Sequence, residues 1–415
     1  MRISPAPSRH GWLLPPGADP AAAPLLLGRG LRALADGWMA VLLPAYLLGL
    51  GFDALQVGVL ITATLLGSAL ATLAVGAFGH RFGSGRLLRA AALLMAATGL
   101  GFAGLQHFWP LLVVAFVGTL NPSGGDVSVF LPLEHARLAA AARGEARTTL
   151  FARYSVAGAL CAALGALAAG MPAVLAKATG LAESQALRLM FAAYALLGVA
   201  VWALYRRLPD ASDAAGAAAT PAAPLRESRR TVLRLAALFG VDAFAGGLVV
   251  NSLLSLWLLQ HFAVSLAQAG LFFFAAGGLS ALSQLLAPLL ARRIGLLPTM
   301  VLTHLPANLC LIGAAFAPTL AWALALLLVR AALSQMDVPT RSAFVMAVVT
   351  PAERSAAASF TAVPRSLAAA LAPALAGAWF AAGWIALPLV ACGVLKVAYD
   401  LALWRSCRGL RLGAD

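Results

Sequence analysis

The stretch LQVGVLITATLLGSALATLAVGAF, residues 55–78, decides the class of fold. It holds no charged side chain and consists mainly of leucine, alanine, valine and other small residues. About 20 apolar residues in a helix cross the hydrocarbon core of a bilayer, which is roughly 30 Å thick. Lipid offers no partners for backbone amides, so a crossing segment is either a helix or a strand of a closed barrel. Because the stretch lacks alternation with a period of two, it predicts a membrane-spanning helix.

The remainder of the chain has the same character. Its 415 residues are 62% hydrophobic and only 11% charged, with a mean hydropathy of +0.90. A soluble domain of this size does not need so much apolar sequence for its core. Apolar runs of similar length recur near residues 29–51, 55–78, 87–106, 109–136, 148–170, 188–206, 232–260, 266–291, 297–317, 319–347, 356–380 and 383–404. We therefore predict an all-α integral membrane protein with twelve spans.

A segment that is poor in bulky apolar residues divides these runs into two groups of six. The predicted organisation is a flexible cytoplasmic tail (1–28), a six-helix bundle (29–206), a cytoplasmic linker (207–230), a second six-helix bundle (231–404) and a cytoplasmic tail (405–415). The linker is rich in alanine, proline and charged residues, a composition typical of a flexible connection.

The formal net charge of +14 is distributed unevenly along the chain. Arginines gather in every second connection, for example Arg81 and Arg86 or Arg292 and Arg293, whereas the other connections hold little beyond Lys177. Cytoplasmic loops of membrane proteins carry such an excess of basic residues. We therefore predict that both termini are cytoplasmic in a bacterial inner membrane. A nucleic-acid partner is excluded, because it would require one soluble basic face.

The two groups of runs resemble each other. Asp36 in the first run corresponds to Asp242 in the seventh, and Asp126 in the fourth corresponds to Asp337 in the tenth, at separations of 206 and 211 residues. Parallel repeats of six spans are typical of transporters. Chance similarity between alanine-rich helices is the alternative, and the matching positions of the charged residues argue against it.

The connection after the second run carries a recognisable motif. In the sequence GAFGHRFGSGR, the residues that matter are Gly76, His80, Arg81, Gly83 and Arg86. They resemble the loop between spans two and three of the major facilitator superfamily, whose pattern is roughly G-x-L-A-D-R-x-G-R-K. The resemblance implies two six-helix bundles that rock around a central site, with spans 1, 4, 7 and 10 lining the cavity. His80 replaces the family's aspartate, so a latch centred on that carboxylate is not expected here.

Each of those four spans holds one aspartate: Asp36, Asp126, Asp242 and Asp337. A carboxylate in the middle of a span is costly and needs a partner or water. Basic partners are available in Arg32, one turn before Asp36, in Arg341, one turn after Asp337, and in Arg153 and Arg365. Glu134 follows Asp126 by two turns. One interpretation is that these ions pair and close the cytoplasmic gate. The other is that one or more aspartates bind a proton or a cationic substrate.

Helix-breaking residues accompany two of the aspartates. Pro122, Gly124 and Gly125 precede Asp126, and Pro339 follows Asp337. Breaks of this kind free backbone carbonyls at transporter sites, although they also serve to kink a helix for shape alone. We hypothesise that Asp126 and Asp337 couple protonation to opening of the gate.

Two further polar patterns lie in the second half. In the tenth run, Arg330, Ser334, Asp337 and Arg341 are spaced as one face of a helix. Lys396 and Asp400, one turn apart in the last run, are expected to pair with each other.

The sequence favours a secondary active transporter of a small solute, coupled to protons and suited to drug or metabolite efflux. No GxxxxGK[ST] motif for ATP and no catalytic HExxH or GxSxG motif occurs, so we predict neither an enzyme nor a cofactor or metal site. The expected partners are a small molecule, protons and the lipid bilayer, and the expected state is a monomer. The alternatives are a passive uniporter or importer, and a transporter-like receptor or accessory protein.

Overall fold

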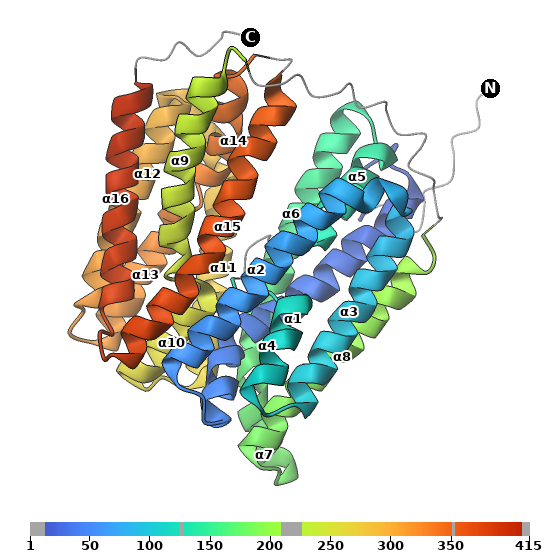
Figure 1. Cartoon of the computed structure of the whole chain (residues 1–415), viewed down its shortest axis with the longest axis vertical. Helices are drawn as coiled ribbons and strands as arrows, with labels where there is room; N and C mark the ends of the chain where they lie inside the picture. The colour runs from blue at the N-terminus through green and yellow to red at the C-terminus, as the bar shows by residue number, and fades with distance from the viewer. Residues whose placement is uncertain (1–12, 124–127, 209–225, 351–352, 409–415) are drawn as a thin grey trace.

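The structure, a computed structural model, describes residues 13–123, 128–208, 226–350 and 353–408. All regular secondary structure in these residues is helical. The helices form two bundles that stand side by side in Figure 1, the N-terminal one coloured blue to green and the C-terminal one yellow to red. The predicted all-α fold with two six-helix bundles is confirmed.

In its described residues the N-terminal bundle has eight α-helices, because its fourth and fifth passes are each divided between two helices. They are α1 (Ala23–Gly49), α2 (Ala54–Phe78), α3 (Ser84–Gly104), α4 (Phe108–Val117), α5 (Phe130–Ala141), α6 (Gly144–Leu167), α7 (Met171–Thr179) and α8 (Glu183–Tyr205). Short 3-10 turns η1 (Pro20–Ala22), η2 (Gly79–Arg81) and η3 (Ala168–Gly170) adjoin them.

The C-terminal bundle also has six passes, of which the first and the fourth are each divided between two helices. Its helices are α9 (Arg229–Gly247), α10 (Asn251–Phe262), α11 (Leu266–Ile294), α12 (Leu296–Ala315), α13 (Leu320–Ser334), α14 (Asp337–Ala347), α15 (Arg354–Ala381) and α16 (Leu387–Cys407).

Ten helical segments in the described residues are long and apolar enough to cross a membrane. The interrupted pass of α4 and α5, and α15 with its 28 residues, complete the twelve predicted spans. The first span begins earlier than residue 29, since α1 starts at Ala23 and buries Leu25 and Leu26. Pro24 stands at the start of this helix, where its missing amide is not needed. The sequence did not predict α7, a separate helix that continues from α6 after η3.

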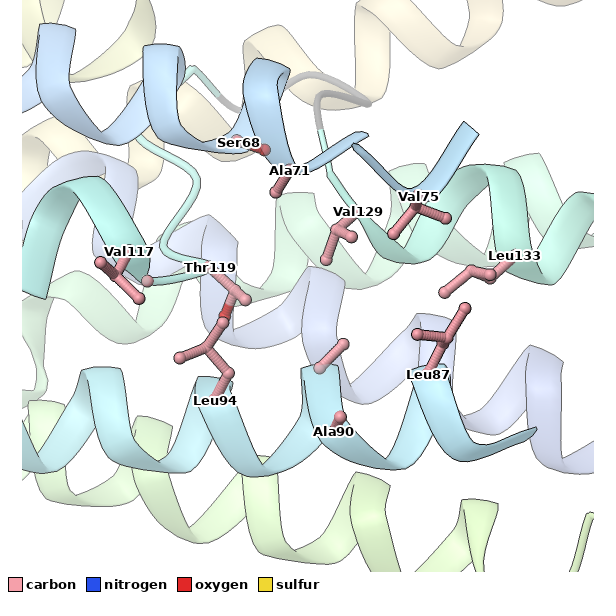
Figure 2. A pocket seen from close by; sticks show the side chains of 12 residues that line it. Ser68, Ala71, Val75, Leu87, Ala90, Leu94, Val117, Thr119, Val129 and Leu133 are labelled. Carbon is pink, nitrogen blue, oxygen red and sulfur yellow. The ribbon is translucent and has the colours of Figure 1, made fainter. Parts of the chain in front are cut away.

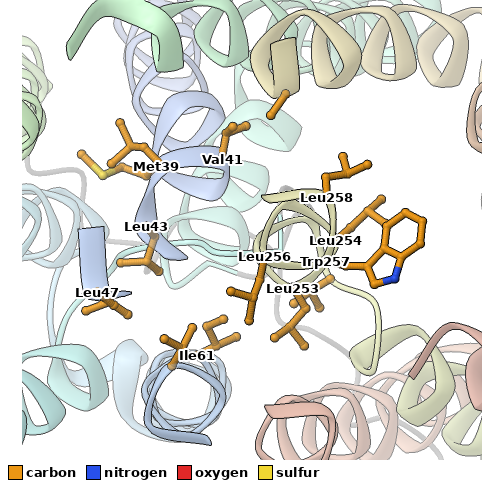
Figure 3. Close-up of a cluster of buried hydrophobic side chains, with 14 of the residues drawn as sticks. Met39, Val41, Leu43, Leu47, Ile61, Leu253, Leu254, Leu256, Trp257 and Leu258 are labelled. Carbon is orange, nitrogen blue, oxygen red and sulfur yellow. The ribbon is translucent and has the colours of Figure 1, made fainter. Parts of the chain in front are cut away.

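The buried apolar residues form one core that both bundles share and two cores that they do not share. The shared core joins α1 and α2 to α10, α11 and α15, and Figure 3 shows Leu256 of α10 pointing toward Ile61 of α2, with Trp257 on the other side of α10. A second core lies within the N-terminal bundle, near the start of α1 and the end of α8, and a third within the C-terminal bundle, near the start of α9 and the end of α16. We call the end with the separate cores the terminal side and the end with the shared core the sealed side. In the part of the chain that the structure describes, a common apolar core therefore joins the two bundles only on the sealed side.

Small residues bring the bundles into backbone contact on the sealed side. A Cβ atom on Gly58 of α2 would lie 2.5 Å from the carbonyl oxygen of Pro373 and 2.9 Å from Cα of Gly377, both on α15. At a second contact between the bundles, the Ser252 hydroxyl of α10 donates to the carbonyl oxygen of Ala40 in α1 at 2.8 Å. We call this contact surface between the bundles on the sealed side the seam. Close packing of small residues is a common way for helices to associate in lipid.

A larger residue at Gly58 is expected to force the sealed side open. Gly58→Leu places side-chain atoms where the backbone of α15 now lies. The conformation in which the sealed side is closed should therefore become less populated, and the conformation in which it is open more populated. The measurement is labelling, by a membrane-impermeant maleimide, of a single cysteine introduced at Ser255 in a cysteine-free background. Labelling should rise in Gly58→Leu. Gly49→Leu is the control, because nothing lies within 4 Å of a Cβ at Gly49; equal labelling in both variants would contradict the prediction.

The segment that precedes α9 is fixed to the terminal side of the C-terminal bundle. The Glu353 carboxylate, before α15, accepts hydrogen bonds from the backbone amides of Arg226 at 2.5 Å, Ser228 at 2.9 Å and Glu227 at 3.0 Å. These amides stabilise the charged form and lower the pKa of Glu353 to about 2. Because the folded pKa lies below the ordinary value, this attachment is present at neutral pH and is lost only as the pH falls toward 2.

Candidate transport site

A buried ionic network joins three helices of the C-terminal bundle. Asp242 of α9 accepts a hydrogen bond on Oδ1 from Lys396 Nζ of α16 at 2.5 Å, and its Oδ2 forms an ion pair with Arg341 Nη1 of α14 at 3.3 Å. The other terminal nitrogen of Arg341 donates to Asp337, one turn earlier in α14. All four side chains are at most 10% exposed. Charges buried in this way are stable only as partners of one another.

A histidine and an amide extend this network on α12. His304 Nδ1 lies 2.9 Å from Oδ1 of Asp400, and Asn308 Nδ2 donates to Oδ2 of the same carboxylate at 3.1 Å. The other ring nitrogen of His304 lies 3.9 Å from Asp242 Oδ1. His304 therefore stands between two carboxylates and connects α12 with α9 and α16.

The predicted pair of Lys396 and Asp400 is wrong, because each finds a partner on another helix. Lys396 bonds to Asp242, and Asp400 bonds to His304 and Asn308. His304 and Asn308 were not predicted as site residues, although their spacing of one turn in an apolar span was a usable signal.

The N-terminal bundle has its own buried cluster around Glu134 of α5. Arg32 Nη2 of α1 donates to the two carboxylate oxygens at 2.6 and 2.5 Å, and the hydroxyls of Tyr154 on α6 and Tyr205 on α8 donate to the same carboxylate. Glu134 is fully buried. Four helices are thus tied to one carboxylate.

The sequence suggested Asp36 as the partner of Arg32, but in the structure Arg32 bonds to another carboxylate. Its hydrogen bonds go to Glu134, whereas Asp36 lies one turn further along α1 and is partly buried. Arg153, on α6, is also partly buried.

The fourth pass is divided by a connection between α4, which ends at Val117, and α5, which begins at Phe130; its described residues, 118–123 and 128–129, are not helical. Within it, the carbonyl oxygen of Pro122 accepts hydrogen bonds from the backbone amide and the hydroxyl of Ser252 at 3.1 and 3.0 Å, so the break contacts α10 of the other bundle. Gly124, Gly125 and Asp126 lie outside the described residues.

A cavity of about 190 Å³ adjoins this interruption inside the N-terminal bundle, as Figure 2 shows. Val75 of α2, Leu94 of α3 and Leu133 of α5 line it, and Ser68 and Thr119 supply its few polar atoms. A second cavity of about 200 Å³ lies between α2 and α5 on one side and α15 on the other. The first is too apolar to be the site of a charged solute.

The tenth pass breaks at Gln335 and Met336, between α13 and α14. The four polar residues that were predicted to share one helical face are therefore divided between two helices, with Arg330 on α13 and Arg341 on α14. Pro339 lies in the first turn of α14, where a missing amide breaks no hydrogen bond. The spacing gave a wrong prediction here because residues share one helical face only if they lie on one continuous helix.

The loop motif lies at the terminal side between α2 and α3. Gly76 is in the last turns of α2, the backbone of His80 and Arg81 forms η2, and Gly83 precedes α3, which contains Arg86. Ser84, the first residue of α3, accepts a hydrogen bond from Arg137 Nε of α5 at 2.8 Å. A neutral hydroxyl thus joins the loop to the fourth pass.

Arg365 of α15 lies in the electrostatic field of Asp242 and Asp337 without a hydrogen bond to either. Among the residues that the structure describes, no group of three histidine, cysteine, aspartate or glutamate side chains is arranged to hold a metal ion.

Comparison with known proteins gives the same architecture. An uncharacterized membrane protein of Saccharomyces cerevisiae is 23% identical over 406 residues, which cover 90% of this chain and 91% of the yeast protein. Among solved structures, a D-xylose-proton symporter is similar with a TM-score of 0.74 and 17% identity, over 92% of this chain and 97% of the other. The nucleoside transporter NupG, as a D323A mutant, gives 0.73 and 14%, over 93% and 100%. A bacterial homologue of the human lysosomal transporter Spinster, in an inward-facing and unoccupied conformation, gives 0.72 and 16%, over 96% and 100%.

The family comparison agrees with the loop motif and the two bundles. The sequence profile of the Major Facilitator Superfamily matches residues 25–336, about three quarters of the chain. This multi-pass membrane protein therefore belongs to the Major Facilitator Superfamily.

Proposed function

We propose that the protein is a secondary active transporter that moves a small solute by alternating access and couples this movement to protons. The observation that carries the proposal is the buried pair of His304 and Asp400, which adjoins the ion pair of Asp242 and Lys396. Histidine is the side chain whose charge ordinarily changes near neutral pH. A proton taken up by this pair would change the charge balance of the whole network.

Ionisable groups face the pair from each helix packed around it. Asp242 on α9 and Lys396 and Tyr399 on α16 adjoin it directly, and Asp337 and Arg341 on α14 and Arg365 on α15 interact with it through Asp242. Because these helices hold each other through charges, a change in one charge alters the free energy of their arrangement. That is the linkage which a coupled carrier requires.

The arrangement of the three cores supports alternating access. The bundles share an apolar core on the sealed side and have separate cores on the terminal side. Rocking of the two rigid bundles against each other would open the sealed side and close the terminal side. With both termini in the cytoplasm of a bacterial cell, as the arginine distribution favours, the sealed side would face outward and this conformation would face inward. We propose export of a metabolite or drug-like solute as the direction to test first, with uptake as its alternative.

The coupling proposal predicts separate effects on proton flux and on solute exchange. In liposomes that contain a pH-sensitive dye, D-xylose and uridine are suitable first probes, followed by a broad panel of solutes. For any solute that moves protons, His304→Gln and Asp400→Asn should abolish both the proton signal and accumulation above equilibrium. Solute exchange without a gradient should continue, because binding and rocking remain.

The matched control is His107→Gln, which changes an exposed histidine in the connection before α4. It should behave like the wild type. Solute accumulation that persists in His304→Gln and Asp400→Asn would refute proton coupling at this pair. Flux without any proton movement in the wild type would indicate a passive uniporter.

A further inference from the structure

Two arginines of the C-terminal bundle lack counter-ions. Arg330 lies on α13 and Arg365 on α15, each near the middle of its pass through the membrane. Within the described residues, neither guanidinium makes an ion pair or a hydrogen bond, and the Nε atom of each is shielded from solvent without a partner. A cation in this position is costly and is normally kept for a function.

The N-terminal bundle shows what a structural arginine looks like in this protein. Arg32 makes two hydrogen bonds to Glu134 at 2.6 and 2.5 Å, and its guanidinium stacks 4.0 Å from the centre of the Phe130 ring. Its charge is neutralised within the fold. Arg330 and Arg365 have no such arrangement, so their charge is not explained by the packing of the bundle.

The nearby carboxylates are already engaged. Asp242 uses one oxygen for Lys396 and the other for Arg341. Asp337 is bonded to Arg341, and Asp400 is held by its histidine and amide partners on α12. Arg365 is attracted by the first two carboxylates at longer range but is also repelled by Arg341. A counter-ion for the free arginines must therefore come from outside the network.

The charge balance of this bundle interior is positive. Among the described residues, its cations within the membrane passes are the buried Arg341 and Lys396 and the partly buried Arg330 and Arg365, against the carboxylates Asp242, Asp337 and Asp400. The excess of one positive charge grows to two when His304 is protonated. An anion that enters is thus favoured in either state, and more so when a proton is bound.

We propose that the transported solute is an organic anion, and that Arg365, which adjoins the network, binds its carboxylate or phosphate group, while Arg330 adds a second uncompensated positive charge to the same bundle. A guanidinium presents a planar set of donors that matches both groups. The proposal rests on the transport function above and names its substrate class. It also makes proton and solute binding mutually favourable, as symport requires.

The first experiment compares solutes that differ only in charge. The melting temperature of the purified full-length protein is measured with glucose and glucuronate, uridine and uridine monophosphate, glycerol and glycerol 3-phosphate, and benzamide and benzoate. A ligand that binds the folded state raises this temperature. We expect the anion of at least one pair to raise it while its neutral partner does not. Chloride and inorganic phosphate are tested alone, because a shift with them and with no organic anion would show a site for a simple ion and overturn the proposal.

The second experiment tests Arg365. Arg365→Gln should weaken the binding of that anion at least tenfold, whereas Arg405→Gln, which removes the same charge from an exposed position in the last turn of α16, should not. Unchanged anion binding in Arg365→Gln, or stabilisation by neutral solutes alone, would overturn the proposal.

A third measurement needs no ligand and guards against variants that fail to fold. Since Arg330 and Arg365 are uncompensated, Arg330→Met and Arg365→Met should raise the melting temperature of the ligand-free protein. Arg341→Met, which leaves Asp337 without its partner, should lower it. A decrease with all three would show that the free arginines are structural and would refute the proposal.

The outcomes separate this inference from the transport function. Proton-coupled accumulation of a neutral solute alone would leave the proposed function intact and overturn the anionic substrate. Arginine-dependent binding of an organic anion that never crosses the membrane would do the reverse: it would support the anion site and refute transport.

Discussion

Replacement of Glu134 by alanine is expected to destabilise the N-terminal bundle more than any other single truncation in it. The change leaves the buried guanidinium of Arg32 without its carboxylate and removes the shared acceptor of Tyr154 and Tyr205. Loss of one partner of a buried ion pair costs about 3–5 kcal/mol. The measurement is the free energy of unfolding of the protein in detergent.

Two variants sharpen this test. Glu183→Ala removes an exposed carboxylate in the first turn of α8 and should change the stability little. In Glu134→Gln, the side chain keeps its shape but loses its charge, so an intermediate loss is expected. If Glu134→Ala were as stable as Glu183→Ala, the carboxylate would not hold the four helices together.

The second large effect is expected at Asp242. Asp242→Asn leaves Lys396 without a carboxylate partner and removes one of the two that Arg341 contacts. We expect a loss of about 3–5 kcal/mol in the free energy of unfolding and the disappearance of gradient-driven accumulation in liposomes.

The double variant Asp242→Asn/Lys396→Met separates the structural part of this effect from the functional part. It removes one charge of each sign and leaves the pair of Asp337 and Arg341 balanced. Most of the lost stability should therefore return, because a matched pair can be replaced at little cost. Accumulation should stay absent, because the network around His304 is no longer complete. Recovery of both would show that the ion pair is only structural.

The sequence was sufficient for the fold because its main determinant is local. A run such as residues 55–78 must be helical in lipid whatever its neighbours are, and the arginines mark the ends of such runs. The helix ends were less predictable. The end of α4 at Val117 and the break at Gln335 depend on tertiary contacts, such as that of Pro122 with Ser252, which no local pattern encodes.

The partners in the site could not be predicted for the same reason. Sequence spacing suggested Asp400 for Lys396 and Asp36 for Arg32, since one turn of helix brings side chains together. In the structure the bonds of Lys396 and Arg32 go instead to carboxylates on other helices, which lie 154 and 102 residues away in the chain. The bonded pair of Asp337 and Arg341 is the case in which local spacing and tertiary contact agree.

The seam on the sealed side has a consequence for how the carrier responds to its surroundings. Its contacts are glycine against backbone, apolar side chains, and hydroxyls such as those of Ser252 and Ser255 that donate to carbonyl oxygens of α1. Neutral contacts of this kind are not screened by salt, whereas exposed charges are. The seam itself is therefore held by shape and neutral hydrogen bonds, so a change in ionic strength should act on solute capture and leave closure of the seam unaffected.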